Sequence, residues 1–551
     1  MTEKLNRFAK PLLVLATSTA AVLMLAGCGN KTASKKAITV GIASEIQTMD
    51  GLHSVDSTSS EVLNNTEDGL IILGKHSKVT PGIAKSWHVS KNGLTYTYTL
   101  RKNAKWNDGT PITAKDFVYS WRRAVNLKTA AENAYMFSGI KNADAIAKSK
   151  KQPSSLGVKA DGKYKLTVTL EHPISYFNMM VANAWFHPQE KKVVEKYGKK
   201  YGTTSSKTAY SGAYVLKGWD GSGSSWTLVK NKHYWNKKNI KLDDVKYQVV
   251  KDPSTGLNMF DDGQLDQVQL QGEQIANERK SKNYVQVEDA RTAYVAINFT
   301  GKTSSPEANK ALQNLNVRKA MSVSLDRNAF VKNVLADGSQ PALGFASRDM
   351  MKDPKNGKTD LTQAGLVKNL VSYNKTAANK YWKQGLKETG LSQLTLTLLS
   401  DDDETSKAIT QYLQGQWSKS LPGLTVKIKT VPKTTRVQYM MDANFDVVLT
   451  SFGPEYNDPA ALLNLQDMGN TYNFGHWNNQ TYHKAMATAN NTANAETRWQ
   501  ALVTAQKTIV QDMGVVPLYQ SSDAFMRNTK LKGVVMNPAG MDPGWRDAYL
   551  K

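Results

Sequence analysis

The sequence predicts a large α/β protein. Short segments in which polar and apolar residues alternate indicate strands with one buried face, and segments with apolar residues at helical spacing lie between them. The chain has 551 residues and a single cysteine, Cys28, so its stability must come from apolar burial and not from disulfides within the chain. Half-polar strands interspersed with helices favour a mixed sheet over a sandwich of evenly spaced strands.

The N-terminus has the organisation of an export signal. Three positively charged residues precede an apolar run over 12–25, which is too short to span a bilayer comfortably. The run ends in Leu25-Ala26-Gly27-Cys28, which resembles the lipobox of bacterial lipoproteins. Two acyl chains on a Cys28 thioether would anchor the chain stably, where one chain is marginal. We therefore predict a signal peptide at 1–27, a lipidated tether at 28–37, and a location at the extracytoplasmic face of the cell membrane.

Four segments have the alternation of half-buried strands. In 94–100 the Leu and Tyr residues share one face and the three Thr residues the other. The same pattern recurs at 164–170, 394–398 and 424–430.

Helices are expected between these strands. Thr113 and Asp116 fit a capping box that opens a helix with Phe117, Trp121 and Ala124 on one face. The segment 316–335 predicts two short helices with a break near 324–326 and Gly338 as their terminator. The segment 499–513 predicts one amphipathic helix that stops at Gly514. The aromatic residues on these helices are expected to be core.

The composition excludes several classes of protein. The net charge is +24, but the lysines are scattered, the chain is exported, and no nucleic-acid-binding signature occurs. The eight histidines form no zinc pattern, and the acidic run 401–404 lacks the glycine and glutamate of a calcium loop. No nucleophile elbow, Walker loop or dinucleotide fingerprint is present. We predict no nucleic-acid partner, no metal, no cofactor and no enzymatic activity. The 12 Trp and 23 Tyr outnumber the 13 Phe, as suits a cavity that is apolar yet able to hydrogen-bond.

Three consecutive segments resemble the signature region of the oligopeptide-binding proteins of ABC importers, the extracellular solute-binding proteins of family 5. They are Val79–Trp87, Asn92–Arg101 and Ala104–Arg123. The likeness continues, in order, through 156–160, 211–217, 231–235, 316–320, 325–327 and 456–459. It therefore covers essentially the whole chain after the predicted signal peptide.

The resemblance implies a periplasmic-binding-protein-like fold with two lobes and an inserted extra domain, the cluster C type. Lobe I would be discontinuous, over 38–67, 190–291 and 515–551. The extra domain would take 68–189, and lobe II would take 292–514. The crossings between lobes would lie near 291–294 and 514–517, and closure of the lobes would bury the ligand.

The resemblance also implies a function. The protein would be a membrane-anchored monomer that captures oligopeptides and delivers them to an ABC permease with its ATPase subunits. A same-fold receptor for a signalling peptide, haem, a metal chelate or an oligosaccharide is the alternative. Two alternatives come from other functional classes. One is an extracellular hydrolase, and the other is an adhesin that binds anionic polymers in a salt-sensitive way.

The family's ligand site maps onto the segment 452–459. Family members place an aspartate, which pairs the peptide α-ammonium, just before a Tyr-Asn-x-Pro segment. Glu455 occupies that position here, followed by Tyr456 and Asn457, with Asp458 as a substitute candidate. Phe452 takes the place of a tryptophan that lines the cleft.

Further site residues follow from the same resemblance. Tyr294 and Asn298 match a strand that binds the peptide backbone, and Ser211 replaces a family asparagine. Leu449 stands where some relatives have an arginine near the ligand's C-terminus, and Lys433 stands where another cleft aromatic is usual. Because the departures concentrate in the pocket, the sequence predicts a divergent ligand specificity.

Overall fold

The computed structural model describes residues 36–540 and 543–551, and residues from 36 onward form one compact unit. The predicted signal peptide, Cys28 and most of the tether lie outside the described residues. No helix among the residues described is long and apolar enough to cross a membrane.

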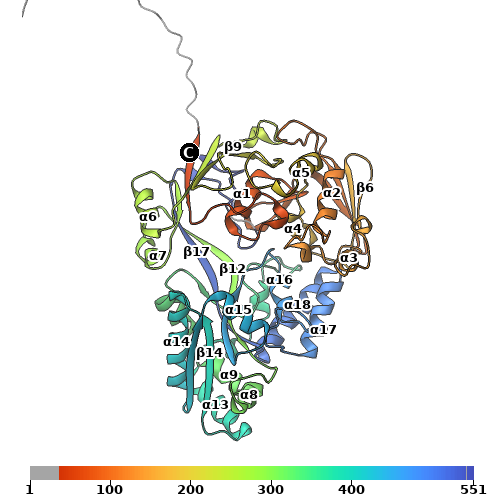
Figure 1. Cartoon of the computed structure of the whole chain (residues 1–551). Helices are drawn as coiled ribbons and strands as arrows, with labels where there is room; N and C mark the ends of the chain where they lie inside the picture. Colours follow the sequence, from red (N-terminus) through yellow and green to blue (C-terminus); the bar gives the residue numbers. More distant parts are fainter. Residues whose placement is uncertain (1–35, 541–542) are drawn as a thin grey trace, which may run out of the picture. The chain divides into compact units, whose positions relative to one another are not determined.

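One mixed sheet dominates the described chain, and it contains 11 strands there. Figure 1 shows its long central strands, β12 and β17, connecting two groups of elements. In spatial order the strands are β15 (Leu424–Val431), β14 (Leu394–Asp401), β16 (Val447–Phe452), β12 (Tyr284–Ile297), β17 (Val515–Arg527), β11 (Gln267–Gln269), β1 (Ala37–Ile42), β10 (Asp244–Val249), β9 (Ser225–Lys230) and β8 (Tyr214–Lys217), and β13 (Gln340–Pro341) pairs with β17 off this path.

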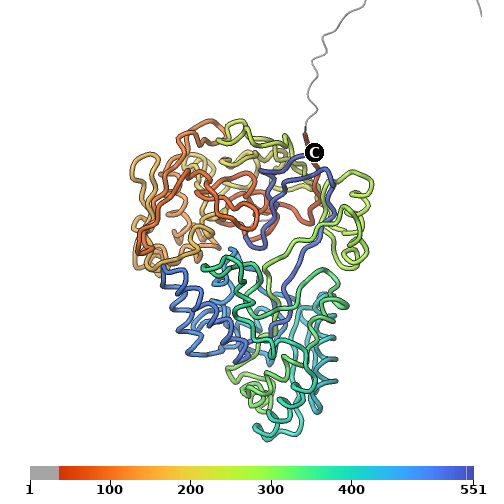
Figure 2. Tube along the Cα trace, turned by 180° about the vertical axis from the view of Figure 1, so that it is seen from behind, coloured from red at the N-terminus to blue at the C-terminus, as the bar shows by residue number. Residues whose placement is uncertain are grey.

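The β12–β17 pair spans both groups of elements. The traces of the two strands run side by side (Figure 2). The second half of β12, from Thr292 to Ile297, pairs with β16 as well as β17, whereas β11 pairs with the far end of β17. The β12–β17 register shifts between Glu288 and Thr292. Residues 289–291 therefore form a bulge at the middle of the sheet, and bulges re-aim side chains.

A second, four-stranded sheet has the order β4 (Ala84–Val89), β5 (Thr95–Leu100), β7 (Lys165–Thr169) and β6 (Val158–Ala160). Helix α2 (Ala114–Ala124) begins with the predicted capping box of Thr113 and Asp116. Phe117, Trp121 and Ala124 are buried on its inner face, as predicted. The Trp121 ring lies 5.4 Å from the ring of Phe186 in an edge-on arrangement, so aromatic packing joins the helix to the loop beyond the sheet.

The apolar residues gather in three main cores. One contains residues between Ala290 and Ala539, a second contains residues between Leu52 and Ala209, and a third combines segments from 38–63, 210–249 and 531–548. The third core is discontinuous in sequence because β1, β10, β9 and β8 are neighbours in the sheet. The domain boundaries expected from the sequence stay a prediction.

The C-terminal segment returns to the beginning of the chain. The Trp545 backbone N–H donates to Asn65 Oδ1 over 2.8 Å, and Arg546 Nη2 lies 2.9 Å from Asp68 Oδ1. The side chain of Asp68 is fully buried, so this ion pair is the partner that makes its burial tolerable.

The predicted strands are confirmed as β5, β7, β14 and β15, and the predicted C-terminal helix is α18 (Ala495–Gln511). Asp403 accepts from Ser406 N–H and caps α14 (Glu404–Ser420), so the acidic run is a helix N-terminus. The segment 316–335 does break, because Asp326 caps a new helix there, α10 (Arg327–Phe330). Gly338 is not its terminator: the following helical turn, Val331–Leu335, ends at the cap residue Ala336, which has a left-handed backbone with φ 51°.

Candidate functional site

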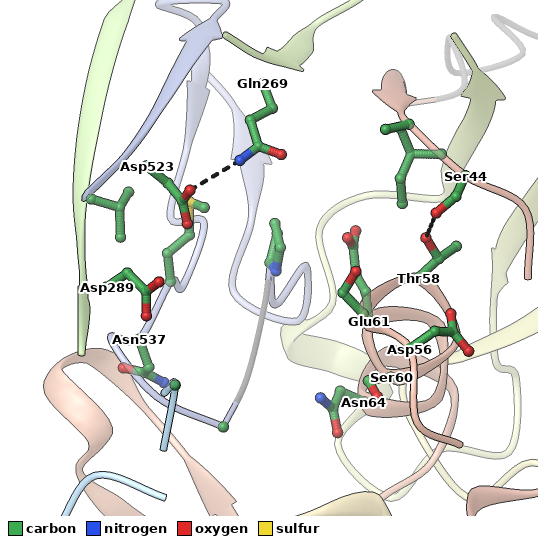
Figure 3. Close-up of a pocket in the computed structure, with 18 of the residues that line it drawn as sticks. Ser44, Asp56, Thr58, Ser60, Glu61, Asn64, Gln269, Asp289, Asp523 and Asn537 are labelled. Carbon is green, nitrogen blue, oxygen red and sulfur yellow. Dashed lines mark hydrogen bonds between the residues drawn. The ribbon is translucent and has the colours of Figure 1, made fainter. Parts of the chain in front are cut away.

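The described residues enclose a cavity of about 780 Å³, within the range of about 300–1,000 Å³ typical of ligand sites. One wall is made by β11, β12 and β17, and the other by helix α1 (Ser57–Thr66) with the loop after β1. Figure 3 shows Asp289 and Asp523 on the first wall and Glu61 and Thr58 on the second. The loop 453–455, directly after β16, contributes a third side.

Local hydrogen bonds set the position of the α1 wall. Asp56 Oδ1 accepts from Ser59 N–H over 2.8 Å and thereby caps the helix. Ser59 Oγ accepts from Gln47 N–H over 3.0 Å, and the hydroxyls of Ser44 and Thr58 are 2.9 Å apart. The loop after β1 is therefore tied to the first turn of α1, and both face the cavity.

The bulge in β12 supplies two charged groups of the opposite wall. Ala290 lies off the β17 ladder, yet its N–H donates to Pro538 O over 2.8 Å and its carbonyl accepts from Ser347 Oγ over 2.5 Å. With its backbone satisfied in this way, the bulge is held in place. Its flanking residues Asp289 and Arg291 both line the cavity, and Arg291 Nε lies 3.5 Å from Asp289 Oδ2.

Glu455 lines the cavity from the loop that follows β16. Its backbone carbonyl accepts from Asn183 Nδ2 over 3.3 Å. This bond ties the loop to the start of the helical turn Ala184–Phe186. Burial raises the pKa of the Glu455 carboxyl, and the positive charge of Arg291 offsets part of the rise. Burial, with the nearby charge of Glu455, also raises the pKa of Tyr135 to about 12, so the Tyr135 hydroxyl keeps its proton beside this carboxyl.

The charges at this point of the cavity do not balance. Burial raises the pKa of Asp289 as well, and Arg291 again offsets part of the effect. One guanidinium thus serves two partly desolvated carboxyls, Asp289 and Glu455. A buried carboxylate without a full countercharge is unfavourable, so this corner of the cavity is suited to a cationic group of a ligand.

Tyr456 and Asp458 lie behind Glu455 and outside the cavity lining. The ring of Tyr456 stacks on that of Tyr176, with centroids 4.8 Å apart and planes at 8°. Asp458 accepts from Arg498 Nη2 and Nη1 over 2.7 and 2.9 Å, and the Arg498 guanidinium lies 5.2 Å from the Tyr176 ring centre. Burial alone lowers the pKa of Arg498, but Asp458 raises it overall. This cluster positions the loop that carries Glu455.

The other predicted residues also lie outside the lining. Asn457 Nδ2 donates to Asp349 O over 3.3 Å, and the half-buried Phe452 ring lies 5.5 Å from that of Tyr472. Tyr294 is buried with its ring edge-on to Phe345. The amide of Asn298 donates to the carbonyls of Lys302, Ala443 and Phe445, and the hydroxyl of Ser211 bonds the backbone of Asp68. Leu449 and Lys433 are outside the lining too.

Eight residues were predicted to contact the ligand. Glu455 lines the cavity, and the other seven do not. A direct ligand role for the other seven stays a prediction, since their side chains contact the protein itself. Sequence reasoning missed Asp289, Arg291, Asp523 and the polar face of α1. The available signal was the spacing of Ser57, Ser60, Glu61 and Asn64, which places polar groups on one helix face.

Residues 78–474 match the family described as bacterial extracellular solute-binding proteins, family 5 Middle. The chain is 35% identical over 542 residues to the dipeptide-binding protein of Lactococcus lactis subsp. cremoris (strain MG1363), which covers 96% of this chain and 97% of that protein. It is 30% identical over 519 residues to the dipeptide-binding protein DppE of Bacillus subtilis (strain 168), covering 94% and 93%.

Listeria monocytogenes OppA, solved bound to peptide, has a similar fold. The TM-score is 0.75 at 34% identity, over 94% of this chain and 99% of that one. This likeness confirms the predicted fold class, an α/β periplasmic-binding-protein-like fold with two lobes. The family consists of solute-binding proteins of ABC transporters, so the prediction that the chain is not an enzyme is also confirmed. The chain belongs to the bacterial extracellular solute-binding proteins of family 5.

Proposed function

We propose that the protein is a membrane-anchored extracytoplasmic receptor that captures oligopeptides and delivers them to an ABC import permease and its ATPase subunits. Membership of the family supports the receptor role, and the names of the two relatives support a peptide as the ligand. The lipobox-like sequence at Cys28 supports attachment of the protein to the membrane through a lipid.

The observation that carries the peptide assignment is the charge at Glu455. The α-ammonium is common to every free peptide and unfavourable to bury without a partner. Two carboxyls that share one guanidinium offer such a partner. An ammonium placed between Glu455 and Asp289 would balance Arg291 and leave the cavity corner neutral.

Free peptides are expected to bind, and their N-acetylated forms to bind much more weakly, because acetylation removes the charge that Glu455 would pair. Isothermal titration with a mixed set of tri- to pentapeptides checks this, and the fluorescence of Trp185, which lines the cavity, gives a second readout. If no peptide binds, the proposed function is wrong and a non-peptide solute must be sought. Peptides recovered shortened would instead indicate hydrolysis.

Peptide binding is also expected to strengthen as the pH rises from acidic to neutral. The pKa of Glu455 is raised above its ordinary 4.5 in the free protein, so the carboxyl is protonated over a wider acidic range. Because the pKa of Glu455 is raised in the folded protein, this group stabilises the peptide-free native state at low pH. That contribution to stability is lost as the pH rises through the raised pKa. A ligand ammonium, whose own pKa is about 7.7–8.0, stays charged across this window and pairs the carboxylate that forms. The peptide-induced rise in Tm should therefore grow with pH.

Thermal unfolding at several pH values, with and without peptide, measures this increase. An N-acetylated peptide serves as the control, because its binding lacks the ammonium. An equal Tm rise at acidic and neutral pH would contradict the pairing.

A further inference from the structure

The segment 536–540 closes the corner of the cavity at which Glu455 and the bulge in β12 meet. At the bulge, the Ala290 N–H donates to Pro538 O over 2.8 Å. At the end of the segment, Gly540 has a left-handed backbone with φ 78°, and a Cβ at this position would meet the carbonyl oxygen of Glu455. The segment is therefore in contact with both the bulge and the loop that carries Glu455.

The side chain of Asn537 is oriented by a hydrogen bond at this corner. Its Oδ1 accepts from the Ser77 N–H over 2.8 Å, and since only the oxygen of the amide can accept, this bond determines which way the amide faces. Asn537 lines the cavity and lies on the same wall as Asp289 (Figure 3). The nitrogen, Nδ2, is consequently the atom of the amide that is left for a ligand.

This nitrogen is buried without a hydrogen-bond partner among the described residues. Asn537 is 5% exposed, and buried polar atoms in native proteins are paired in the large majority of cases. The backbone beside it is satisfied, because Pro538 O accepts from Ala290 N–H. The unsatisfied donor is thus one atom of a cavity-lining residue, next to the corner where Glu455 and Asp289 share Arg291.

A donor at this corner is suited to an uncharged acceptor. The amide nitrogen of Asn537 can donate but cannot accept. An ammonium between Glu455 and Asp289 already balances the charge of the corner with Arg291. A carboxylate on the next carbon of the ligand would bring a negative charge that has no partner there. The group that must follow the ammonium is therefore a neutral carbonyl.

Building on the proposed function, we propose that Asn537 recognises the first backbone carbonyl of the bound peptide. Glu455 pairs the α-ammonium, and Asn537 Nδ2 donates to the carbonyl oxygen of the same peptide residue. Together the two side chains recognise an ammonium followed by an uncharged carbonyl, which is the N-terminal residue of any free peptide. Free amino acids are excluded, because they have a carboxylate at that point.

A peptide with a single thioamide tests this hydrogen bond in the natural protein. Sulfur accepts hydrogen bonds more weakly than oxygen does. Replacing the first carbonyl oxygen of Ala-Ala-Ala by sulfur should therefore weaken binding about three- to tenfold, the range of one hydrogen bond. The thioamide at the second carbonyl is the matched control for the size of sulfur, and its loss should be smaller.

The outcomes of this titration are distinct. A first-position thioamide that binds as tightly as Ala-Ala-Ala, or no more weakly than the second-position thioamide, overturns the role assigned to the first carbonyl and leaves the peptide function standing. Absence of binding by Ala-Ala-Ala itself overturns the proposed function.

Asn537→Asp identifies the donor. The carboxylate can still accept from the Ser77 N–H but cannot donate, so the ratio of affinities between Ala-Ala-Ala and its first-position thioamide should fall toward one. Asn328→Asp is the matched control, because Asn328 is exposed, lies outside the cavity lining and undergoes the same chemical change. An Asn537→Asp ratio equal to that of the control overturns the role of Asn537.

Asn537→Leu separates the ligand contact from the anchor to Ser77. Leucine has a similar volume but no polar atom, so the variant should show the same ratio near one together with a lower Tm, because the bond to Ser77 is lost. A lower Tm with the ratio of the natural protein would show that Asn537 holds the segment in place without contacting the peptide, and would overturn the proposal.

Alanine and alaninamide test the need for an uncharged carbonyl. The two molecules differ in the group that follows the ammonium, a carboxylate in alanine and a neutral carboxamide in alaninamide. In competition with Ala-Ala-Ala, alaninamide is expected to displace the tripeptide at lower concentration than alanine. Equal behaviour of the two, or stronger displacement by alanine, would overturn the exclusion of free amino acids.

Discussion

Replacing Glu455 by glutamine is expected to weaken the binding of free peptides by about 2–5 kcal/mol, the cost of removing one partner of a buried charge pair, which is roughly 30-fold or more in Kd. Arg291 and Asp289 would then neutralise each other, and the ligand ammonium would enter a corner with no charge left to balance it. Titration calorimetry of the variant and the natural protein with one tripeptide measures the loss.

The free Glu455→Gln protein should change in the opposite direction. Since burial raises the pKa of Glu455, ionising it at neutral pH disfavours the native state, and the neutral amide removes that penalty. We expect an unchanged or higher Tm without peptide together with the weaker binding. A variant that merely misfolds would lose both.

One control variant separates the effect of Glu455 from that of the other carboxyls in the cavity lining. Glu132→Gln removes another carboxylate of the lining and should leave discrimination between free and N-acetylated peptides intact. If Glu455→Gln binds free peptides as tightly as the natural protein does, the ammonium pairs elsewhere, with Asp289 as the next candidate.

Replacing Asp458 by asparagine is expected to destabilise the fold by about 3–5 kcal/mol, because it leaves a buried charge without its partner. The side chains of Arg498 and Asp458 are 3% and 8% exposed, and both guanidinium Nη atoms donate to Asp458. Asparagine can accept one of these bonds but cannot balance the charge. Urea denaturation followed by tryptophan fluorescence measures the loss in the free energy of unfolding.

The double variant Asp458→Asn with Arg498→Met is the decisive comparison. If the loss comes from an uncompensated guanidinium, removing that group recovers part of the stability, because buried ion pairs are often replaceable by apolar residues. A double variant that is less stable than Asp458→Asn alone would contradict this explanation and indicate that Arg498 matters through its packing over Tyr176.

The elements that could be predicted from the sequence are those whose cause is local. Alternation identified β5 and β7 because each strand has one buried face and one face that is only partly buried. The capping box of α2 was visible because Thr113 and Asp116 are three residues apart. The end of the helical segment at the cap residue Ala336 could not be predicted. An alanine with a left-handed backbone leaves no marker in the sequence.

The site could be predicted only in part for a related reason. Glu455 was identifiable from a family motif, and it does line the cavity. The partners that engage its neighbours come from distant segments: Arg498 is 40 residues from Asp458, and Tyr176 is far upstream of Tyr456. Asp289 reaches the cavity through a bulge, which depends on the pairing of β12 with β17 and leaves no periodic trace.

The return of the C-terminal segment to the beginning of the chain has a consequence for biogenesis. Strand β17 lies between β12 and β11, and the buried Asp68 acquires Arg546 as its partner only when the final residues are present. The discontinuous core therefore cannot form stepwise as the polypeptide emerges, because its contacts join opposite ends of the chain. The native fold can therefore be completed only once the last residues of the chain are available, and a chain truncated near its C-terminus should leave the early segments without their partners.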